Sequence, residues 1–247
     1  MKLARLVRVP LSALALGPRD LPRDPGHYLC VVHRLGPGDE FVAFDPELAL
    51  EARGKLLLVE RALIRCELAA PTPARKSGLG VTLLQATAKG DRIEQVVRGA
   101  TALGVDRIVL VVTERSVARP ADVRRERLRT IAIEAARQSG RGDLPSLEGP
   151  APFAEQMAAF ADWDGLKLCL SPRATLGLAQ RLHGLPLDQP AALLIGPEGG
   201  LTETELEAAQ SAGFLPVGLG PLILRTELAA LAALGCFAGR LSGDGDE

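Results

Sequence analysis

The amino-acid sequence predicts an α/β fold with a mostly parallel sheet, preceded by a smaller β-rich part. From residue 81 onwards, short apolar runs typical of buried strands alternate with longer stretches of helical periodicity. Residues 1–70 contain strand-like runs instead. The chain has 247 residues, of which 47% are hydrophobic, so it can form one large domain or a small and a medium one.

The β-rich part ends in a stretch typical of a linker. Strands are expected over 3–9 and 55–68, the second as one long strand or two. Residues 38–45 are expected to form a turn followed by a strand, and residues 27–35 a short helix. Residues 71–80 contain two prolines, two glycines and two adjacent cations, without periodicity. We therefore place a linker over 73–80, between a first domain of 1–72 and a second of 81–247.

The second domain shows the alternation on which the fold class depends. The expected strands are 81–86, 107–112 and 166–170, and the expected helices are 91–103, 124–139, 153–160 and 175–182. Within the first of these helices, Ile93, Val96, Val97 and Ala100 recur on one face. Gly104 follows where a helix-terminating glycine belongs.

The last quarter of the chain contains two strand-loop-helix units. A strand over 192–195 leads into a glycine-rich loop, and Thr202 with Glu205 forms a capping box that starts a helix. A strand over 217–219 leads into a second loop and a helix that starts at Thr226. Two such loops at the carboxyl ends of neighbouring strands form a crevice, which is where open α/β sheets bind ligands.

Several functional classes are poorly supported by the sequence. The two loops contain neither the dinucleotide-binding glycine spacing nor a P-loop, and no serine-hydrolase elbow occurs. The four cysteines are isolated and the three histidines do not stand at metal-ligand spacing with them, so we expect no metal and a reducing compartment. The apolar run 11–16 is too short for a signal peptide, and no stretch is long enough to cross a membrane. These features predict a cytoplasmic protein.

Several ordered stretches of the sequence resemble a known family. Residues 195–202 (IGPEGGLT) and 219–227 (LGPLILRTE) resemble the SPOUT class of RNA methyltransferases, and within it most of all the RsmE-type 16S ribosomal RNA uridine-N3 methyltransferases. The blocks 89–94 (KGDRIE), 100–105 (ATALGV) with 114–117 (ERSV), and 133–141 (IEAARQSGR) match the same family in the same order. The resemblance covers nearly the whole chain.

The resemblance implies a fold, a cofactor and partners. The fold would be a SPOUT-type parallel sheet with a C-terminal trefoil knot, preceded by a small PUA-like β-barrel domain that helps to hold RNA. The cofactor would be S-adenosyl-L-methionine, and the substrate 16S ribosomal RNA or the small ribosomal subunit. The knot would pack against a second copy of the chain, so the resemblance implies a homodimer.

The resemblance also assigns residues to the cofactor. Three loops would hold it, through Leu170, Ser171, Leu194, Ile195, Gly196, Pro197, Glu198, Gly199, Gly200, Leu219, Gly220, Ile223, Leu224 and Arg225. Backbone groups would read the adenine edge, and the side chains of Leu194, Leu219, Ile223 and Leu224 would flank the ring. A methyl carbon on a sulfonium is already electrophilic, so alignment and removal of one proton are what remain for the protein.

The proton on uridine N3 leads to three catalytic candidates. Arg225 stays charged and can donate two hydrogen bonds to a carbonyl oxygen of a uracil anion. The helix N-terminus at Thr226 adds a favourable partial charge for an anion. Glu198 and Glu227 are the nearest bases. Either carboxylate could instead have a purely structural role, in a loop or in the first turn of the helix.

Phosphate contacts should position the RNA. The candidate residues are Arg5, Arg8, Lys89, Arg92, Arg115, Arg119 and Arg141, and each could equally be an ordinary surface charge. This chain departs from the family at Leu222, where an arginine is usual, at Leu228, where a threonine is usual, and at Ala102, where a glutamate is usual.

Two other hypotheses remain open at this stage. The chain could be a SPOUT protein that acts on a different target, or one that binds RNA without catalysis. A missing affinity for S-adenosylmethionine would support the non-catalytic alternative. It could also be an NAD-dependent oxidoreductase, although it does not contain the dinucleotide fingerprint.

Overall fold

The computed structural model describes residues 6–76, 78–88, 91–116 and 123–241. The chain divides into two compact units, one formed by residues 1–77 and 133–144, the other by 78–132 and 145–247. Along the chain, the first unit passes into the second between residues 77 and 78.

Residues 133–144 belong to the first unit, although sequence reasoning placed them with the second domain. The guanidinium of Arg137 stacks 3.9 Å above the ring of Tyr28, and the N–H of Gly142 donates to the carbonyl of Arg75 over 2.7 Å. These partners are far away in the sequence, so the local periodicity of 133–144 could not predict the contacts.

The first unit is built on a six-stranded sheet in the order β1-β3-β4-β5-β2, with β6 also paired to β4. Its strands are β1 (Val7–Pro10), β2 (Gly17–Asp20), β3 (Glu40–Asp45), β4 (Leu50–Val59), β5 (Ile64–Leu68) and β6 (Thr72–Pro73). The pair β1–β3 is parallel and the other pairs are antiparallel. In β4 the burial alternates, with Ala52 and Leu56 inside and Arg53 and Lys55 outside, as expected for a sheet with one solvated face.

The run 55–68 is two strands, which is the second of the two predicted alternatives, because a turn at 60–63 separates β4 from β5. Other expectations for this unit were wrong in detail. The helix expected over 27–35 starts earlier, as α1 (Arg23–His27), and continues into the π-helical turn η1 (Tyr28–Val32). β2 was not predicted, since its four residues (GPRD) contain a glycine and a proline.

The second unit contains a six-stranded parallel sheet in the order β12-β10-β11-β7-β8-β9. The strands are β7 (Val81–Ala86), β8 (Arg107–Val112), β9 (Ser146–Pro152), β10 (Leu166–Leu170), β11 (Ala191–Ile195) and β12 (Leu215–Val217). The predicted parallel α/β sheet is therefore confirmed. β9 was missed because its composition (SLEGPAP) is typical of a loop, and it is tolerated at the edge of the sheet.

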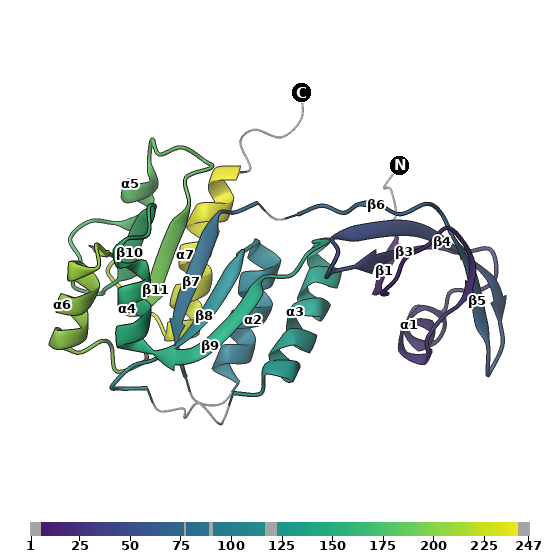
Figure 1. Cartoon of the computed structure of the whole chain (residues 1–247), viewed down its shortest axis with the longest axis horizontal. Helices are drawn as coiled ribbons and strands as arrows, with labels where there is room; N and C mark the ends of the chain where they lie inside the picture. Colours follow the sequence, from purple (N-terminus) through teal and green to yellow (C-terminus); the bar gives the residue numbers. More distant parts are fainter. Residues whose placement is uncertain (1–5, 77, 89–90, 117–122, 242–247) are drawn as a thin grey trace. The chain divides into compact units, whose positions relative to one another are not determined.

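Helices cover both faces of this sheet (Figure 1). They are α2 (Arg92–Leu103), α4 (Phe153–Ala161), α5 (Leu178–Leu182), α6 (Glu203–Ser211) and α7 (Thr226–Leu241), while α3 (Arg125–Ser139) runs from this unit into the first. On one face, Leu84, Val109 and Leu194 form a core with residues of α4 and α6. On the other face, α2 packs against α7.

Local signals placed the helix ends well. Thr202 and Glu205 form the predicted capping box, and Gly104 ends α2 at a φ of 95°. The helix expected over 175–182 is shorter, since α5 starts only at Leu178, and the strand expected over 217–219 lies two residues earlier, as β12. Across the described residues, none of the helices has the length and apolar character that crossing a membrane requires.

Gly149 in β9 leads to a stability prediction. It has a φ of +82°, and an added Cβ would collide with the carbonyl oxygen of Leu110 in β8. Gly149→Ala should lower the free energy of unfolding by about 1–3 kcal/mol, because strain and collision add. Urea denaturation measures this change. Gly239→Ala is the control: it lies in α7 with no atom within 4 Å of an added Cβ, and should not destabilise the protein. Equal stability of the two variants would contradict the prediction.

Candidate active site

The candidate site lies at the carboxyl ends of β10, β11 and β7, which are neighbouring strands inside the parallel sheet. The chain order changes direction here: β8 and β9 follow on one side of β7, while β11, β10 and β12 lie on the other. Ligands of α/β sheets bind at such a switch point, at the carboxyl ends of the strands. The loops that follow β10, β11 and β12 are the three in which the sequence predicts a cofactor site.

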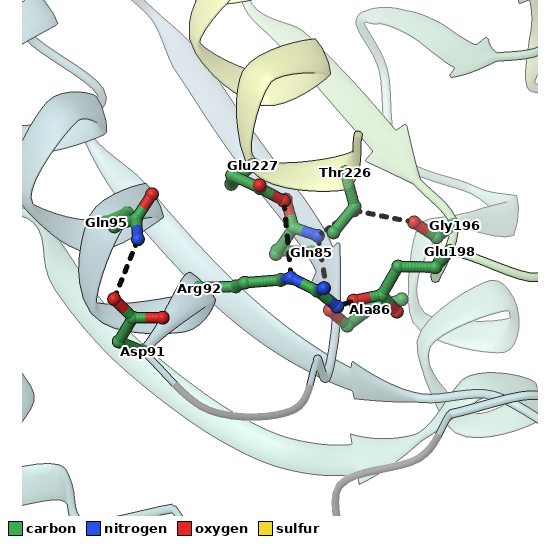
Figure 2. Close-up of polar contacts among 9 residues, drawn as sticks. All are labelled: Gln85, Ala86, Asp91, Arg92, Gln95, Gly196, Glu198, Thr226 and Glu227. Carbon is green, nitrogen blue, oxygen red and sulfur yellow. Dashed lines mark hydrogen bonds and ion pairs between the residues drawn. The ribbon is translucent and has the colours of Figure 1, made fainter. Parts of the chain in front are cut away.

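A buried threonine joins three of these elements (Figure 2). The hydroxyl of Thr226, the first residue of α7, donates to the carbonyl oxygen of Gly196 over 2.8 Å. The same hydroxyl accepts from Nε2 of Gln85 in β7 over 2.9 Å, and this amide also donates to the carbonyl of Ala86 over 3.1 Å. Gln85 is 0% exposed and Thr226 4%. The end of β7, the loop after β11 and the start of α7 are therefore held together by one hydrogen-bonded link.

An arginine lies between the two predicted bases (Figure 2). Arg92, the first residue of α2, forms an ion pair with Glu198, and its Nε lies 3.9 Å from Oε2 of Glu227. The side chains of these residues are 33%, 28% and 13% exposed, respectively. We call Arg92, Glu198 and Glu227 the arginine cluster. A residue predicted to contact RNA and two predicted bases thus come together from three separate elements.

Arg225 is exposed, directly before this cluster in the chain. Within the described residues, its guanidinium has no hydrogen bond or ion pair. Leu222 and Ile223 in the same loop are 77% and 85% exposed. This loop therefore offers one cation and two apolar side chains to a molecule outside the chain.

The loop after β10 is tied to the loop after β12 by backbone hydrogen bonds. The N–H of Gly218 donates to Leu176 over 2.9 Å, and the N–H of Leu178 donates to Gly218 over 2.8 Å. A Cβ at Gly218 would lie 3.4 Å from the carbonyl oxygen of Ala174, so the two loops are closely packed. Two of the three predicted cofactor loops thus form one bonded unit.

The predicted cofactor residues differ in how accessible they are. Leu194, Ile195 and Pro197 are buried, Leu170, Ser171, Gly196, Leu219 and Leu224 are half-buried, and Glu198, Gly199, Gly200, Gly220, Ile223 and Arg225 are exposed. Leu194 does not match the role of flanking a ring, because its side chain belongs to the core beneath α4 and α6. At Gly200 and Gly220, with φ of +71° and +115°, no atom lies within 4 Å of an added Cβ. The backbone there is open to a ligand.

Arg115 and its neighbour fasten the glycine-rich loop. The guanidinium of Arg115 donates to the carbonyl of Gly199 over 2.9 Å. The N–H of Glu114 donates to Oε1 of Glu205 over 2.8 Å, while Oε2 of Glu205 accepts from the N–H of Thr202 over 2.9 Å. Glu205 therefore joins the capping box of α6 to the turn after β8. In this arrangement Arg115 orients the loop rather than pointing freely into solvent.

Two cations predicted to contact RNA are enclosed by protein. Arg8 pairs with Glu51 over 2.7 Å and stacks above Phe44, and its side chain is 11% exposed. Arg141 pairs with Asp143 over 2.8 Å, and its side chain is 4% exposed. A guanidinium that is enclosed and paired in this way is poorly placed to meet a phosphate, so these positions favour structural roles, while contact with RNA stays a prediction. Arg5, Lys89 and Arg119 lie outside the described residues.

The thiols do not suit nucleophilic chemistry. Burial raises the pKa of the Cys169 thiol to about 12 and that of the Cys66 thiol to about 11. Burial also raises the pKa of Cys30 and of Cys236. A reactive cysteine needs the thiolate, which these environments disfavour. Among the residues with described positions, no three His, Cys, Asp or Glu side chains gather into a possible metal site.

Sequence reasoning missed Gln85 and the buried role of Thr226. Gln85 is the one amide side chain in the strand VTLLQA, and a buried polar residue among apolar neighbours indicates a specific hydrogen-bond partner. The link between Arg92 and the two carboxylates was also missed. Arg92 stands 106 positions before Glu198 and still farther from Glu227, and no local pattern connects them.

Comparisons with known proteins show which family this chain resembles. A sequence model of the RNA methyltransferase domain matches residues 75–238. Ribosomal RNA small subunit methyltransferase E of Synechocystis sp. is 34% identical over 84% of this chain and 68% of its own, and that of Bacillus subtilis is 29% identical over 86% of both. The structure of a protein with the same name from Neisseria gonorrhoeae, bound to S-adenosyl methionine, covers 96% of this chain and 98% of its own with 30% identity and a TM-score of 0.82.

Proposed function

We propose a function from one premise: the chain belongs to the RNA methyltransferase family. It transfers the methyl group of S-adenosyl-L-methionine to N3 of a uridine in the 16S RNA of the small ribosomal subunit. The observation that carries this proposal is the likeness to a relative bound to S-adenosyl methionine, which extends over 96% of the chain and includes both units. The site of action would be the cytoplasm, where ribosomal subunits are assembled.

The residues at the strand ends fit an uncharged adenosine group. The loops around 170–171, 196–200 and 219–225 would hold it, mainly through backbone groups at the open glycines. No phosphate cradle is needed for such a ligand, in agreement with the missing dinucleotide and P-loop motifs. When bound, the cofactor supplies an electrophilic methyl carbon.

The protein then has to align the uracil and manage one proton. Arg225 is exposed beside the cluster, so its two-pronged guanidinium can bind a uracil carbonyl oxygen and stabilise charge there. Glu198 and Glu227 are the carboxylates within the cluster that could accept the N3 proton. Metal ions have no step to perform in this scheme.

Further aspects of the fold belong to this proposal. The trefoil knot is supported by the path of the chain: after β12, beside β10 near one edge of the sheet, it returns so that Thr226 bonds to Gly196 and Gln85 at the central strands. The first unit, with its six paired strands, would be the PUA-like domain. A homodimer is supported by exposed Leu222, Ile223 and Leu228, and sedimentation measurements would test it.

Methyl transfer is the decisive test. Labelled cofactor and small ribosomal subunits from a strain without this gene should give label in 16S RNA, and mass mapping should locate it on the base of one uridine. Label on a ribose would contradict the proposed target atom. Absence of both cofactor binding and methyl transfer would favour an RNA-binding protein that does not catalyse.

Cofactor choice can be tested by stability. S-adenosyl-L-methionine at a hundred times its dissociation constant should raise the free energy of unfolding by about 2.7 kcal/mol, because it binds only the folded chain. NAD at the same concentration should have no effect. Thermal unfolding followed by calorimetry measures both, and stabilisation by NAD alone would revive the oxidoreductase hypothesis.

A further inference from the structure

Glu227 has a buried oxygen whose hydrogen-bonding capacity is unused. In the described part of the chain, its Oε2 finds no hydrogen-bond donor, although the side chain is only 13% exposed. The nearest cation, Nε of Arg92, lies 3.9 Å away, which is too far for a hydrogen bond. Proteins seldom leave a buried acceptor unpaired unless it serves a function. Arg92 thus attracts this carboxylate without occupying the lone pair.

Gln85 provides a second unused acceptor beside the same turn of α7. Its Nε2 donates to Ala86 and Thr226, and Oε1 has no partner in the described structure. The carbonyl of Ala86 can only accept, so it determines which end of the amide carries the hydrogens. Since Gln85 is 0% exposed, its unpaired oxygen is a second observation that points to a donor from outside the chain.

Glu198 is less suited than Glu227 to accept a proton. Its Oε1 is engaged by Arg92, and its side chain is twice as exposed, at 28% against 13%. The engaged carboxylate holds Arg92 from the loop after β11, while Arg92 reaches Glu227 in α7. Figure 2 shows the guanidinium between the two carboxylates. The three residues therefore differ in role: Glu198 anchors Arg92, Arg92 orients Glu227, and Glu227 keeps an oxygen available to accept a proton.

We propose that Arg92 is a positioning residue, held by Glu198, that orients Glu227 so that Oε2 takes the N3 proton of the target uracil. This inference rests on the proposed function. The N3–H bond breaks and its proton passes to Glu227. The electron pair left on N3 forms the bond to the methyl carbon, and the sulfur keeps the pair of the broken S–C bond. The negative charge of Glu227 and the positive charge of the sulfonium are both neutralised.

The test compares RNA that carries uridine at the target with RNA that carries 5-fluorouridine, whose N3 proton is more acidic. Glu227→Gln and Arg92→Met should each lower kcat on uridine RNA by about 10²–10⁴-fold, the range of general-base contributions. On 5-fluorouridine RNA the loss should be clearly smaller, because less help is needed to remove the proton. The dissociation constant of S-adenosylmethionine should remain unchanged, which also shows that the variants are folded.

A double variant separates positioning from an independent effect. If Arg92 acts through Glu227, then Arg92→Met combined with Glu227→Gln should be no slower than Glu227→Gln alone. Arg92→Lys, which keeps the charge, should recover part of kcat. Arg127→Met is the matched control: Arg127 also pairs with a carboxylate of α2, Glu94, but on the surface, and kcat should not change.

Each other outcome overturns the proposal. Equal losses on the two RNAs would give the cluster a structural role, and weaker cofactor binding with retained kcat would place Glu227 against the cofactor. Multiplying losses in the double variant would remove the positioning role of Arg92. If the wild-type protein transfers no methyl group to small-subunit RNA, the proposed function itself fails, and that result is distinct from all of these.

Discussion

Replacing Arg225 with alanine is expected to lower kcat for methyl transfer by about 10²–10³-fold, the usual effect of losing one donor to a developing anion. Affinity for S-adenosylmethionine should fall far less than kcat. The reason lies in the position of Arg225, which is exposed at the start of α7 and has no internal partner among the described residues. Its loss removes no contact that supports the fold. Single-turnover transfer and calorimetric titration of the cofactor measure the two quantities.

Arg225→Lys provides the matched comparison. Lysine keeps the charge but not the planar pair of donors, so it should restore only part of kcat. Full activity of the Arg225→Lys variant together with no activity of the Arg225→Ala variant would mean that the positive charge alone is required, as in a phosphate contact. Unchanged turnover in Arg225→Ala would remove the residue from catalysis.

Replacing Thr226 with valine is expected to lower the free energy of unfolding by about 2–4 kcal/mol, because each buried group left unpaired costs about 1–3 kcal/mol. The hydroxyl accepts from Gln85 and donates to Gly196, and valine of nearly equal size can do neither. Because Gly196 lies in a predicted cofactor loop, cofactor affinity should fall as well. Urea denaturation and cofactor titration measure these changes.

Thr226→Ser is the control, since it keeps the hydroxyl and should preserve both the stability and the cofactor affinity better than valine. The double variant Gln85→Leu with Thr226→Val should lose less stability than the two single losses added together, because both ends of one bond are removed. Strict additivity would show that the bond between them contributes little.

Much of the second unit could be predicted from local signals. Runs such as 81–86 and 107–112 were correct to the residue as strands, because continuous apolar runs arise where both faces of a sheet are covered. Thr202 and Glu205 correctly predicted the start of α6, because the hydrogen bonds of their capping box form within four residues. Sequence reasoning missed β9 because the strand contains glycine and proline. A strand at the edge of a sheet can form despite a low β-propensity when it pairs with its neighbour, here β8.

The site was predicted only in part, for a similar reason. Sequence resemblance pointed to the loops, and these do follow neighbouring strands of one sheet. It could not tell an enclosed arginine from an accessible one. Arg8 and Arg141 are paired inside the protein, while Arg92 reaches two carboxylates from other elements. Charge is visible in a sequence, but the partner of a charge is not.

The sequence by itself determined the parallel sheet, the start of α6, the end of α2 and the family, because periodicity, caps and short motifs act over neighbouring residues. Only the tertiary structure decided that Gln85 meets Thr226 across 141 positions and that Arg92 meets Glu198 across 106. Such contacts depend on how strands are ordered and how α7 returns to the middle of the sheet. That packing is a property of the whole chain, so no single stretch of sequence contains it.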